Sequence, residues 1–184
     1  MSILYAAGLT DEIAAIVHRG GIGVLRTDTL YGIVAQAKNE KAVERVYRAK
    51  TRTPSKSPIV LIASPDDMFD TYDRSTYLRL KELWPGRNSI ILPSTEAPFW
   101  IRRDNGSVAY RVPDDPELRN FLMQTGPLIA PSANIEGEAP AMSIKQAEAY
   151  FGTTVDFYVD GGTVMDASPS RLYRMTEKDL ERLR

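Results

Sequence analysis

The segment from Lys50 to Lys56 reads KTRTPSK and carries three cations, Lys50, Arg52 and Lys56, on a stretch that Pro54 stiffens. Cations this close together can hold a triphosphate, which a conventional phosphate-binding loop holds with backbone amides. No conventional loop is present, because GGIG at 20–23 lacks both a GK[ST] ending and the third glycine of a dinucleotide-binding turn. Charge alone leaves a solvated basic loop as the alternative.

A second polar segment, PSANIEGEAP, begins at Pro131 and follows an apolar stretch that reads as a buried strand. Its hydroxyl and amide groups, on Ser132 and Asn134, can bind a ribose or a phosphate. They can equally satisfy the hydrogen bonds of their own turn. Both interpretations stay open from the sequence.

Arg111 lies near the end of SVAYRVP, an alternating stretch that predicts a strand. Val108, Tyr110 and Val112 share one face of this strand, so Ala109 and Arg111 share the other. A guanidinium on a strand face can form a bidentate pair with a carboxylate ligand. The alternative is a structural ion pair with another side chain.

Composition excludes several kinds of site. Zero cysteines exclude disulfides, thiolate nucleophiles and cysteine-bound zinc, and a single histidine excludes HExxH sites. That histidine, His18, falls in the last turn of a predicted helix, where we interpret it as a surface residue. A net charge of -1 argues against binding nucleic acid over the whole surface. The sequence has neither a membrane span nor a secretory signal, so we expect a cytosolic protein with no membrane contact.

Caps and apolar periodicity predict the elements that must position these residues. Thr10 or Asp11 caps a helix that runs to about Arg19, and Asn39 caps a helix that ends near Lys50. Further helices are expected after Pro65 and at 76–83, 116–123 and 143–150. Strands are expected at 23–26, 59–63, 89–92, 107–112, 128–130, 155–159 and 171–173. The tail 176–184 reads as a short helix or an extended lid.

Helices and strands thus interleave, although without a regular βα repeat. We therefore predict an α/β fold, a single domain over residues 1–184 in which helices flank a twisted mixed sheet. Hydrophobic residues make up 43% and charged residues 26% of the chain, as in soluble globular proteins.

The order of these motifs resembles that of the YrdC/TsaC family of threonylcarbamoyl-adenylate synthases. RTDTLYG resembles the family's PTETxYG element, and AKTRTPSKSPIVLI is similar to KxRPxxKPLIVL. LWPGRNSIIL matches WPGPxTxxL, SVAYRVP matches VAVRxP, and GPLIAPSANIEGEAP matches GxPLxxxSANxSG. Near the end of the chain, VDGG, SPSRLYRM and LERLR resemble VDGG, STVVD and RxLR. The resemblance implies a YrdC-like fold in its short form, without an extra carboxy-terminal domain.

Several positions depart from the family's patterns. Asp28 replaces a glutamate, Thr53 replaces the proline after Lys-x-Arg, and Asn88 follows Arg87 after WPG. Arg26 stands at the usual proline of the first element, and Arg171 at the threonine of ST. Since Arg26, Arg87 and Arg171 add charge, we expect them to change the charge near the inferred site.

The resemblance implies an enzyme, a nucleotidyltransferase that makes threonylcarbamoyl-AMP and pyrophosphate from L-threonine, bicarbonate and ATP, for threonylcarbamoyladenosine modification of tRNA. Lys50 and Arg52 would be catalytic. The residues expected to bind ATP are Lys50, Arg52, Lys56, Ser107, Ser132, Asn134 and Arg184. Those expected to bind threonine are Thr27, Arg111 and Ser170. Mg²⁺ would arrive with ATP and be held by phosphates and water, with no metal ligand assigned to the protein.

Two other functions stay open. A basic groove in this fold could bind RNA without catalysis. The related carbamoyl-adenylate-forming domain of hydrogenase maturation proteins is the second alternative. For the synthase we expect a tRNA-modifying protein complex as downstream partner, and a weak direct contact with RNA is a further hypothesis.

Overall fold

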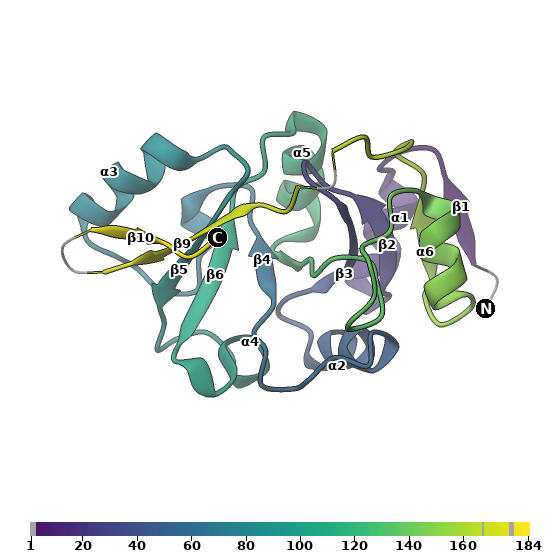
Figure 1. Ribbon diagram of the computed structural model, residues 1–184, viewed down its shortest axis with the longest axis horizontal. Coiled ribbons are helices and arrows are strands. Elements are labelled where there is room, and N and C mark those ends of the chain that lie inside the picture. The colour runs from purple at the N-terminus through teal and green to yellow at the C-terminus, as the bar shows by residue number, and fades with distance from the viewer. Residues whose placement is uncertain (1–2, 167, 177–178) are drawn as a thin grey trace.

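The computed structural model describes residues 3–166, 168–176 and 179–184. Within them one sheet crosses the molecule from β10 to β1 (Figure 1), in the order β1-β8-β2-β3-β7-β4-β6-β5-β9-β10. Its strands are β1 (Leu4–Ala6), β2 (Gly23–Arg26), β3 (Tyr31–Gln36), β4 (Ile59–Leu61), β5 (Asn88–Pro93), β6 (Ser107–Arg111), β7 (Leu128–Ile129), β8 (Phe157–Val159), β9 (Arg171–Met175) and β10 (Leu180–Arg182). Parallel and antiparallel pairs both occur, so the predicted α/β fold with a mixed sheet is confirmed.

The helices enclose two apolar cores. They are α1 (Asp11–His18), α2 (Glu40–Ala49), α3 (Arg74–Leu83), α4 (Phe99–Arg102), α5 (Pro116–Thr125) and α6 (Ile144–Phe151), with two short 3-10 turns at Pro65–Asp67 and Arg103–Asn105. One core joins α1 and α5 to strands from β1 to β4 in the sheet order, and the other joins α2, α3, α4 and α6 to strands from β8 to β10. Burial of these apolar faces supplies most of the stability of such helices.

The predicted caps are confirmed. Thr10 Oγ1 accepts a hydrogen bond from Ile13 N at 3.3 Å, and Asn39 Oδ1 accepts one from Ala42 N at 3.1 Å. Each cap satisfies an amide that has no partner within its own helix. The end of α2 therefore places Lys50 at the start of the basic loop. His18 is exposed at the end of α1, as predicted.

The elements β3, β1 and α4 were not predicted. No strand was predicted at β3, because residues 31–35 are all buried and so show no alternation of polar and apolar side chains. The short strand β1 and the single helical turn α4 gave no periodic signal. In the tail, for which a short helix or an extended lid was expected, residues 180–182 are extended and form a strand that pairs antiparallel with β9; residues 177 and 178 lie outside the described residues.

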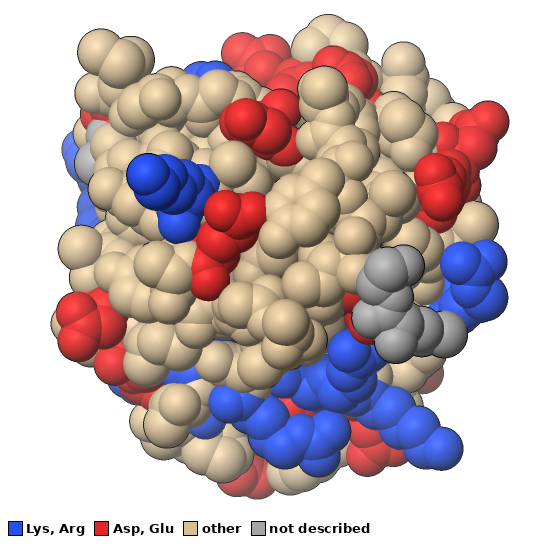
Figure 2. Space-filling model, turned by 90° about the vertical axis from the view of Figure 1, so that its right-hand side faces the viewer, with Lys and Arg blue, Asp and Glu red and all other residues tan. Residues whose placement is uncertain are grey.

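Charge is distributed unevenly over the surface. On the face drawn in Figure 2, Lys and Arg side chains gather in the lower part, the side on which Figure 1 places α2. Lys38, Lys41 and Arg48 are exposed in or just before this helix. Within the described residues, no helix has the length and apolar character needed to span a bilayer. The cytosolic location stays a prediction.

Candidate active site

A cavity of ≈ 930 Å³ lies against the middle of the sheet. Its walls come from the turn after β2, the basic loop, one face of β6, the loop after β7, and β9 together with Arg184. The size suits a ligand of nucleotide dimensions. Segments distant in the sequence thus meet at one place.

Two strands contribute alternate residues to this cavity. From β6 the lining residues are Ser107, Ala109 and Arg111. From β9 they are Leu172 and Arg174, together with Ser170 just before the strand. On β6 the other face, with Val108 and Tyr110, is buried in the core. The predicted orientation of Arg111 is confirmed, because Arg111 opens on the cavity and its neighbours do not.

The cavity wall is strongly cationic. Four arginines line it, Arg52, Arg111, Arg174 and Arg184, and within the described residues no Asp or Glu side chain does. Guanidinium groups bind phosphates and carboxylates through paired N–H donors. The wall therefore favours a ligand with several negative charges.

Arg111 is held by the turn after β2. Its side chain is 4% exposed, and Nη2 lies 3.1 Å from Asp28 Oδ1 and 3.3 Å from Thr27 Oγ1. Burial lowers the pKa of Arg111, and the charge of Asp28 opposes that shift. Nε has no hydrogen-bond partner among the described residues. The ion pair that the sequence left open is thus present, and it fixes the guanidinium at the cavity wall.

Thr27 is one of the organising residues of the same turn. Its hydroxyl donates to Leu30 O at 2.8 Å and accepts from Thr29 N at 3.2 Å, which closes the turn. Because Thr27 also lines the cavity, the local hydrogen bonds fix the position of a group that faces the ligand space.

The end of the chain lies across the cavity. Arg184 donates from Nε and Nη2 to Ser170 O, at 3.3 and 3.1 Å. Ser170 is buried, and its hydroxyl lies 2.8 Å from that of Ser89. Ser170 and Arg184, which the resemblance assigns to threonine and ATP, therefore adjoin each other, and Ser107 lines the same space.

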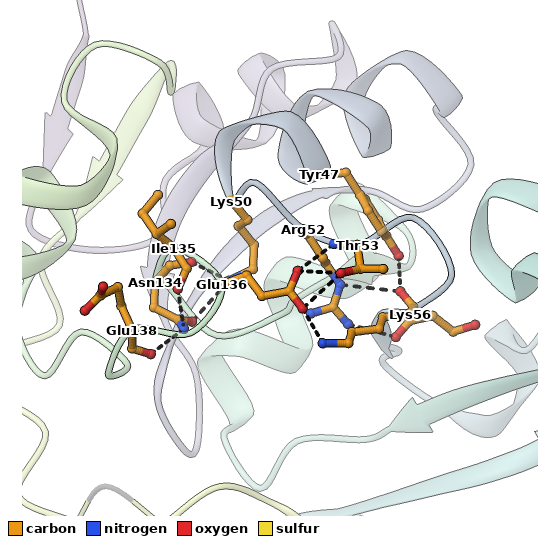
Figure 3. A network of polar contacts seen from close by, with 10 residues as sticks. Tyr47, Lys50, Arg52, Thr53, Lys56, Asn134, Ile135, Glu136 and Glu138 are labelled. Carbon is orange, nitrogen blue, oxygen red and sulfur yellow. Dashed lines mark hydrogen bonds and ion pairs between the residues drawn. The ribbon is translucent and has the colours of Figure 1, made fainter.

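Lys50 lies outside the lining residues. It is 2% exposed, and Nζ donates to Ser132 O. Nζ also donates to Asn134 O at 2.6 Å and to Asn134 Oδ1 at 3.1 Å (Figure 3). Burial, with the nearby charge of Arg52 and against that of Glu136, lowers the pKa of Lys50 from 10.5 to about 7. Lys50 thus holds the 132–134 loop, and its expected contact with phosphate stays a prediction.

The polar loop after β7 largely satisfies itself. Ser132 Oγ donates to Asn134 Oδ1 at 2.7 Å, and Asn134 Nδ2 donates to the carbonyls of Ile135 and Glu138. Ser132 lines the cavity, whereas Asn134 is not among the lining residues. Asn134 therefore shapes the wall in this structure, and its expected contact with ATP is untested.

Arg52 and Lys56 of the basic loop lie in different surroundings. Arg52 lines the cavity, with Nη2 donating to Ser57 O at 3.1 Å and the guanidinium 5.6 Å from the ring centre of Tyr47. The Lys56 side chain is 57% exposed and forms an ion pair with Glu136. Lys56 is absent from the lining residues, so its predicted role also remains untested.

Sequence reasoning missed Arg174 and Glu136. Arg174 could have been found, because it continues the alternation of Ser170 and Leu172 one residue beyond the strand predicted at 171–173. Glu136 gave no local signal, since it contacts residues far away in the sequence.

The departures Arg26 and Arg87 line a second cavity of ≈ 330 Å³ beside the Asp28 turn. Arg26 donates to Gly161 O at 2.7 Å, and Arg87 lies 3.4 Å from Asp166. Arg171 is exposed and lines neither cavity. The expected change of charge therefore falls beside the main cavity rather than within it.

A sequence profile of the Sua5/YciO/YrdC domain, described as telomere recombination, matches residues 15–184. The chain belongs to this family. Two curated relatives are named threonylcarbamoyl-AMP synthase: one from Marinobacter nauticus, 32% identical over 85% of this chain and 85% of its own length, and one from Chromohalobacter salexigens, 33% identical over 89% and 90%.

Solved structures of the family share the fold. Sua5 of P. abyssi complexed with L-threonine matches with a TM-score of 0.87 and 27% identity, covering 100% of this chain. The chain spans only 57% of that Sua5 chain. E. coli YciO matches with a TM-score of 0.85 and 19% identity over 100% of this chain and 94% of its own, and this likeness shows the fold alone.

Proposed function

We propose that this chain is a threonylcarbamoyl-AMP synthase, a nucleotidyltransferase that acts in the threonylcarbamoyladenosine modification of tRNA. The names of relatives that align over most of the chain support this function. The observation that carries the proposal is the cavity wall with four arginines and, in the described part of the chain, no acid. A triphosphate and a carboxylate bound together need such a wall.

The proposed reaction joins three substrates in two steps. The amine of L-threonine adds to bicarbonate, loses water and forms an N-carboxy group. One oxygen of this group then attacks the α-phosphorus of ATP, a P–O bond breaks, and pyrophosphate leaves. No proton-transferring histidine or nucleophilic cysteine is required, because positioning and charge compensation supply the catalysis.

The arginines have separate roles in this proposal. Arg111, fixed by Asp28 and Thr27, pairs with the threonine carboxylate, beside the hydroxyl of Ser170. Arg52 and Arg184 face the triphosphate. Arg174, on the same wall, adds a cation near the leaving pyrophosphate. Such cations offset the charge that develops as the P–O bond breaks.

Mg²⁺ belongs to the substrate in this proposal. The lining residues offer hydroxyl and carbonyl oxygens, and no group of three or more His, Cys, Asp or Glu side chains suited to a metal occurs among the described residues. We therefore propose that Mg²⁺ enters on the phosphates of ATP, which are its preferred ligands in such sites.

The test is a reaction with purified protein, ATP, Mg²⁺, bicarbonate and radiolabelled threonine. We expect a labelled threonylcarbamoyl-AMP and an equal amount of pyrophosphate, and both should vanish when bicarbonate is omitted. If pyrophosphate is released at the same rate with and without threonine and bicarbonate, the proposal is ruled out.

The basic face that includes α2 is the observation that favours a contact with RNA. For RNA binding without catalysis we expect an RNA affinity that falls steeply with salt and no consumption of ATP in the presence of threonine. For the synthase we expect ATP to be consumed in the presence of threonine, without an RNA affinity that falls steeply with salt. That a tRNA-modifying protein complex receives the adenylate is a separate prediction, which a pull-down experiment tests.

A further inference from the structure

The carboxylate of Glu136 is bound by the basic loop. It accepts hydrogen bonds from Thr53 N and from Thr53 Oγ1, the latter at 3.1 and 3.3 Å, and it forms an ion pair with Lys56 (Figure 3). These donors hold the pKa of Glu136 down to about 2, with Lys56 the largest contribution. Glu136 is therefore ionised at neutral pH and contacts a cation that the resemblance assigns to ATP.

The three donors Thr53 N, Thr53 Oγ1 and Lys56 Nζ converge on this carboxylate, and the set of donors is here called the Thr53 hollow. A backbone amide, a hydroxyl and an ammonium group that converge on one point can bind a phosphate oxygen as readily as a carboxylate oxygen. Arg52 and Ser57, which flank these donors in the sequence, both line the main cavity.

Both partners stand at positions that depart from the family's quoted patterns. Thr53 occupies the proline position of KxRPxxKPLIVL, and proline has no N–H to donate. Glu136 occupies the serine position of SANxSG. The two departures are far apart in the sequence and contact each other directly. The contact therefore belongs to this chain rather than to the general pattern.

We propose that Glu136 is an affinity-determining residue, whose carboxylate occupies the Thr53 hollow and competes there with the polyphosphate chain of the substrate. This inference rests on the proposed function for the identity of the polyphosphate. The backbone of Glu136 is held separately, since its N–H donates to Lys50 O at 2.9 Å. The side chain can thus leave the hollow without the 132–138 loop moving.

A fixed clasp is the competing explanation, in which Glu136 and Lys56 only stiffen the loop. The two explanations predict opposite signs. If Glu136 competes with the ligand, removing its charge frees Lys56 and tightens polyphosphate binding. If the pair is a clasp, removing either partner loosens the loop and weakens binding.

The test is calorimetric titration of inorganic tripolyphosphate into the full chain and its variants. We expect Glu136→Gln to tighten binding at least about threefold, since it removes both an intramolecular partner and a repelling charge. Lys56→Met should weaken binding, and Glu136→Gln added to Lys56→Met should give a smaller gain than Glu136→Gln gives alone, because only the Thr53 donors and the removed repulsion then contribute. The matched control is Glu138→Gln, because Glu138 enters the network of Figure 3 only through its backbone carbonyl.

The inference is overturned if Glu136→Gln binds tripolyphosphate no better than Glu138→Gln, or if Glu136→Gln and Lys56→Met both weaken binding. Neither result depends on turnover. If the chain forms no adenylate, yet Glu136→Gln tightens and Lys56→Met weakens tripolyphosphate binding, the proposed function is refuted and the inference stands. If the chain forms the adenylate and these changes in affinity are not seen, the inference is refuted and the proposed function stands.

Discussion

Lys50 and Lys56 stand at the two ends of the segment KTRTPSK and lie in opposite surroundings. Lys50 is 2% exposed and donates to three oxygens of the 132–134 loop. The Lys56 side chain is 57% exposed and has one acidic partner, Glu136. The difference teaches that a lysine in a motif is available to a ligand only when the protein's own oxygens leave some of its N–H donors free.

The arginines differ from both lysines in this respect. Arg52 donates Nε and Nη2 to the carbonyls of Lys56 and Ser57, yet a guanidinium has five N–H donors. Arg111 has its ion pair with Asp28 and still lines the cavity. An arginine can therefore be fixed by the protein and still contact the ligand, whereas Lys50 has no donor left once its three oxygens are bound.

The largest effect is expected for the buried lysine. Lys50→Met leaves three buried oxygens without their donor, so we expect unfolding free energy to fall by roughly 2 to 5 kcal/mol and turnover to fall at least about a hundredfold. Urea unfolding and the adenylate assay measure the two losses. The control is Arg48→Met, on the exposed face of α2. Equal stability of the two variants would show that Lys50 does not hold the loop.

The exposed loop is expected to lose activity without losing stability. Arg52→Ala removes a cavity-lining cation, so turnover should fall about a hundredfold, as when one preorganised electrostatic contact is lost. Unfolding free energy should change by less than about 0.5 kcal/mol. Steady-state kinetics and urea unfolding decide this, and Arg48→Ala is the silent control. An active Arg52→Ala would remove the loop from the site.

Arg111 tests whether a buried cation can also bind a ligand. Lysine keeps the charge but not the paired donors, so Arg111→Lys should weaken threonine binding by roughly 1.5 to 3 kcal/mol. Affinity for a non-hydrolysable ATP analogue should change little. Calorimetric titration of each ligand measures both. Unchanged threonine affinity, together with a lower stability, would leave Arg111 only its ion pair with Asp28.

The pH dependence of stability reports the charge of the same buried lysine, Lys50. The pKa of Lys50 is lowered from 10.5 to about 7, so between these values the unfolded chain binds more protons at this residue than the folded chain. Stability should then rise with pH across this window, by at most about 1.4 kcal/mol per pH unit, and be lost as pH falls through 7. Urea unfolding of wild type and Lys50→Met from pH 7 to 9 measures the difference. Parallel curves would mean that the three oxygens keep the ammonium charged.

Much of the fold could be predicted because its signals are local. Thr10 and Asn39 cap the helices they precede, and the alternation around Arg111 placed it on the correct face of β6. The strand β3 could not be predicted in this way, since both of its faces are buried and the period is lost. The pairing of β10 with β9 depends on tertiary contact and left no local signal.

The same distinction between local signals and tertiary contacts applies to the residues of the site. Arg52, Arg111, Ser170 and Arg184 line one cavity, as the resemblance led us to expect. Lys50 lies behind the cavity wall, and Glu136 binds Thr53 and Lys56. Both arrangements depend on contacts between the basic loop and a segment about 80 residues later in the chain. A charge pattern along the chain carries no information about such partners.

The β9–β10 hairpin and the residues that flank it form one wall of the cavity. Since Ser170, Leu172, Arg174 and Arg184 supply that wall, the cavity exists only in molecules whose hairpin is docked on β5. Ligand occupancy and docking are therefore linked equilibria, and a ligand at a hundred times its dissociation constant stabilises the docked state by about 2.7 kcal/mol. Amide hydrogens of β9 and β10 should exchange more slowly when the ligand is bound, and those of α1 should respond less. The carboxy-terminal hairpin would thus report, through its own rate of opening, whether the site is filled.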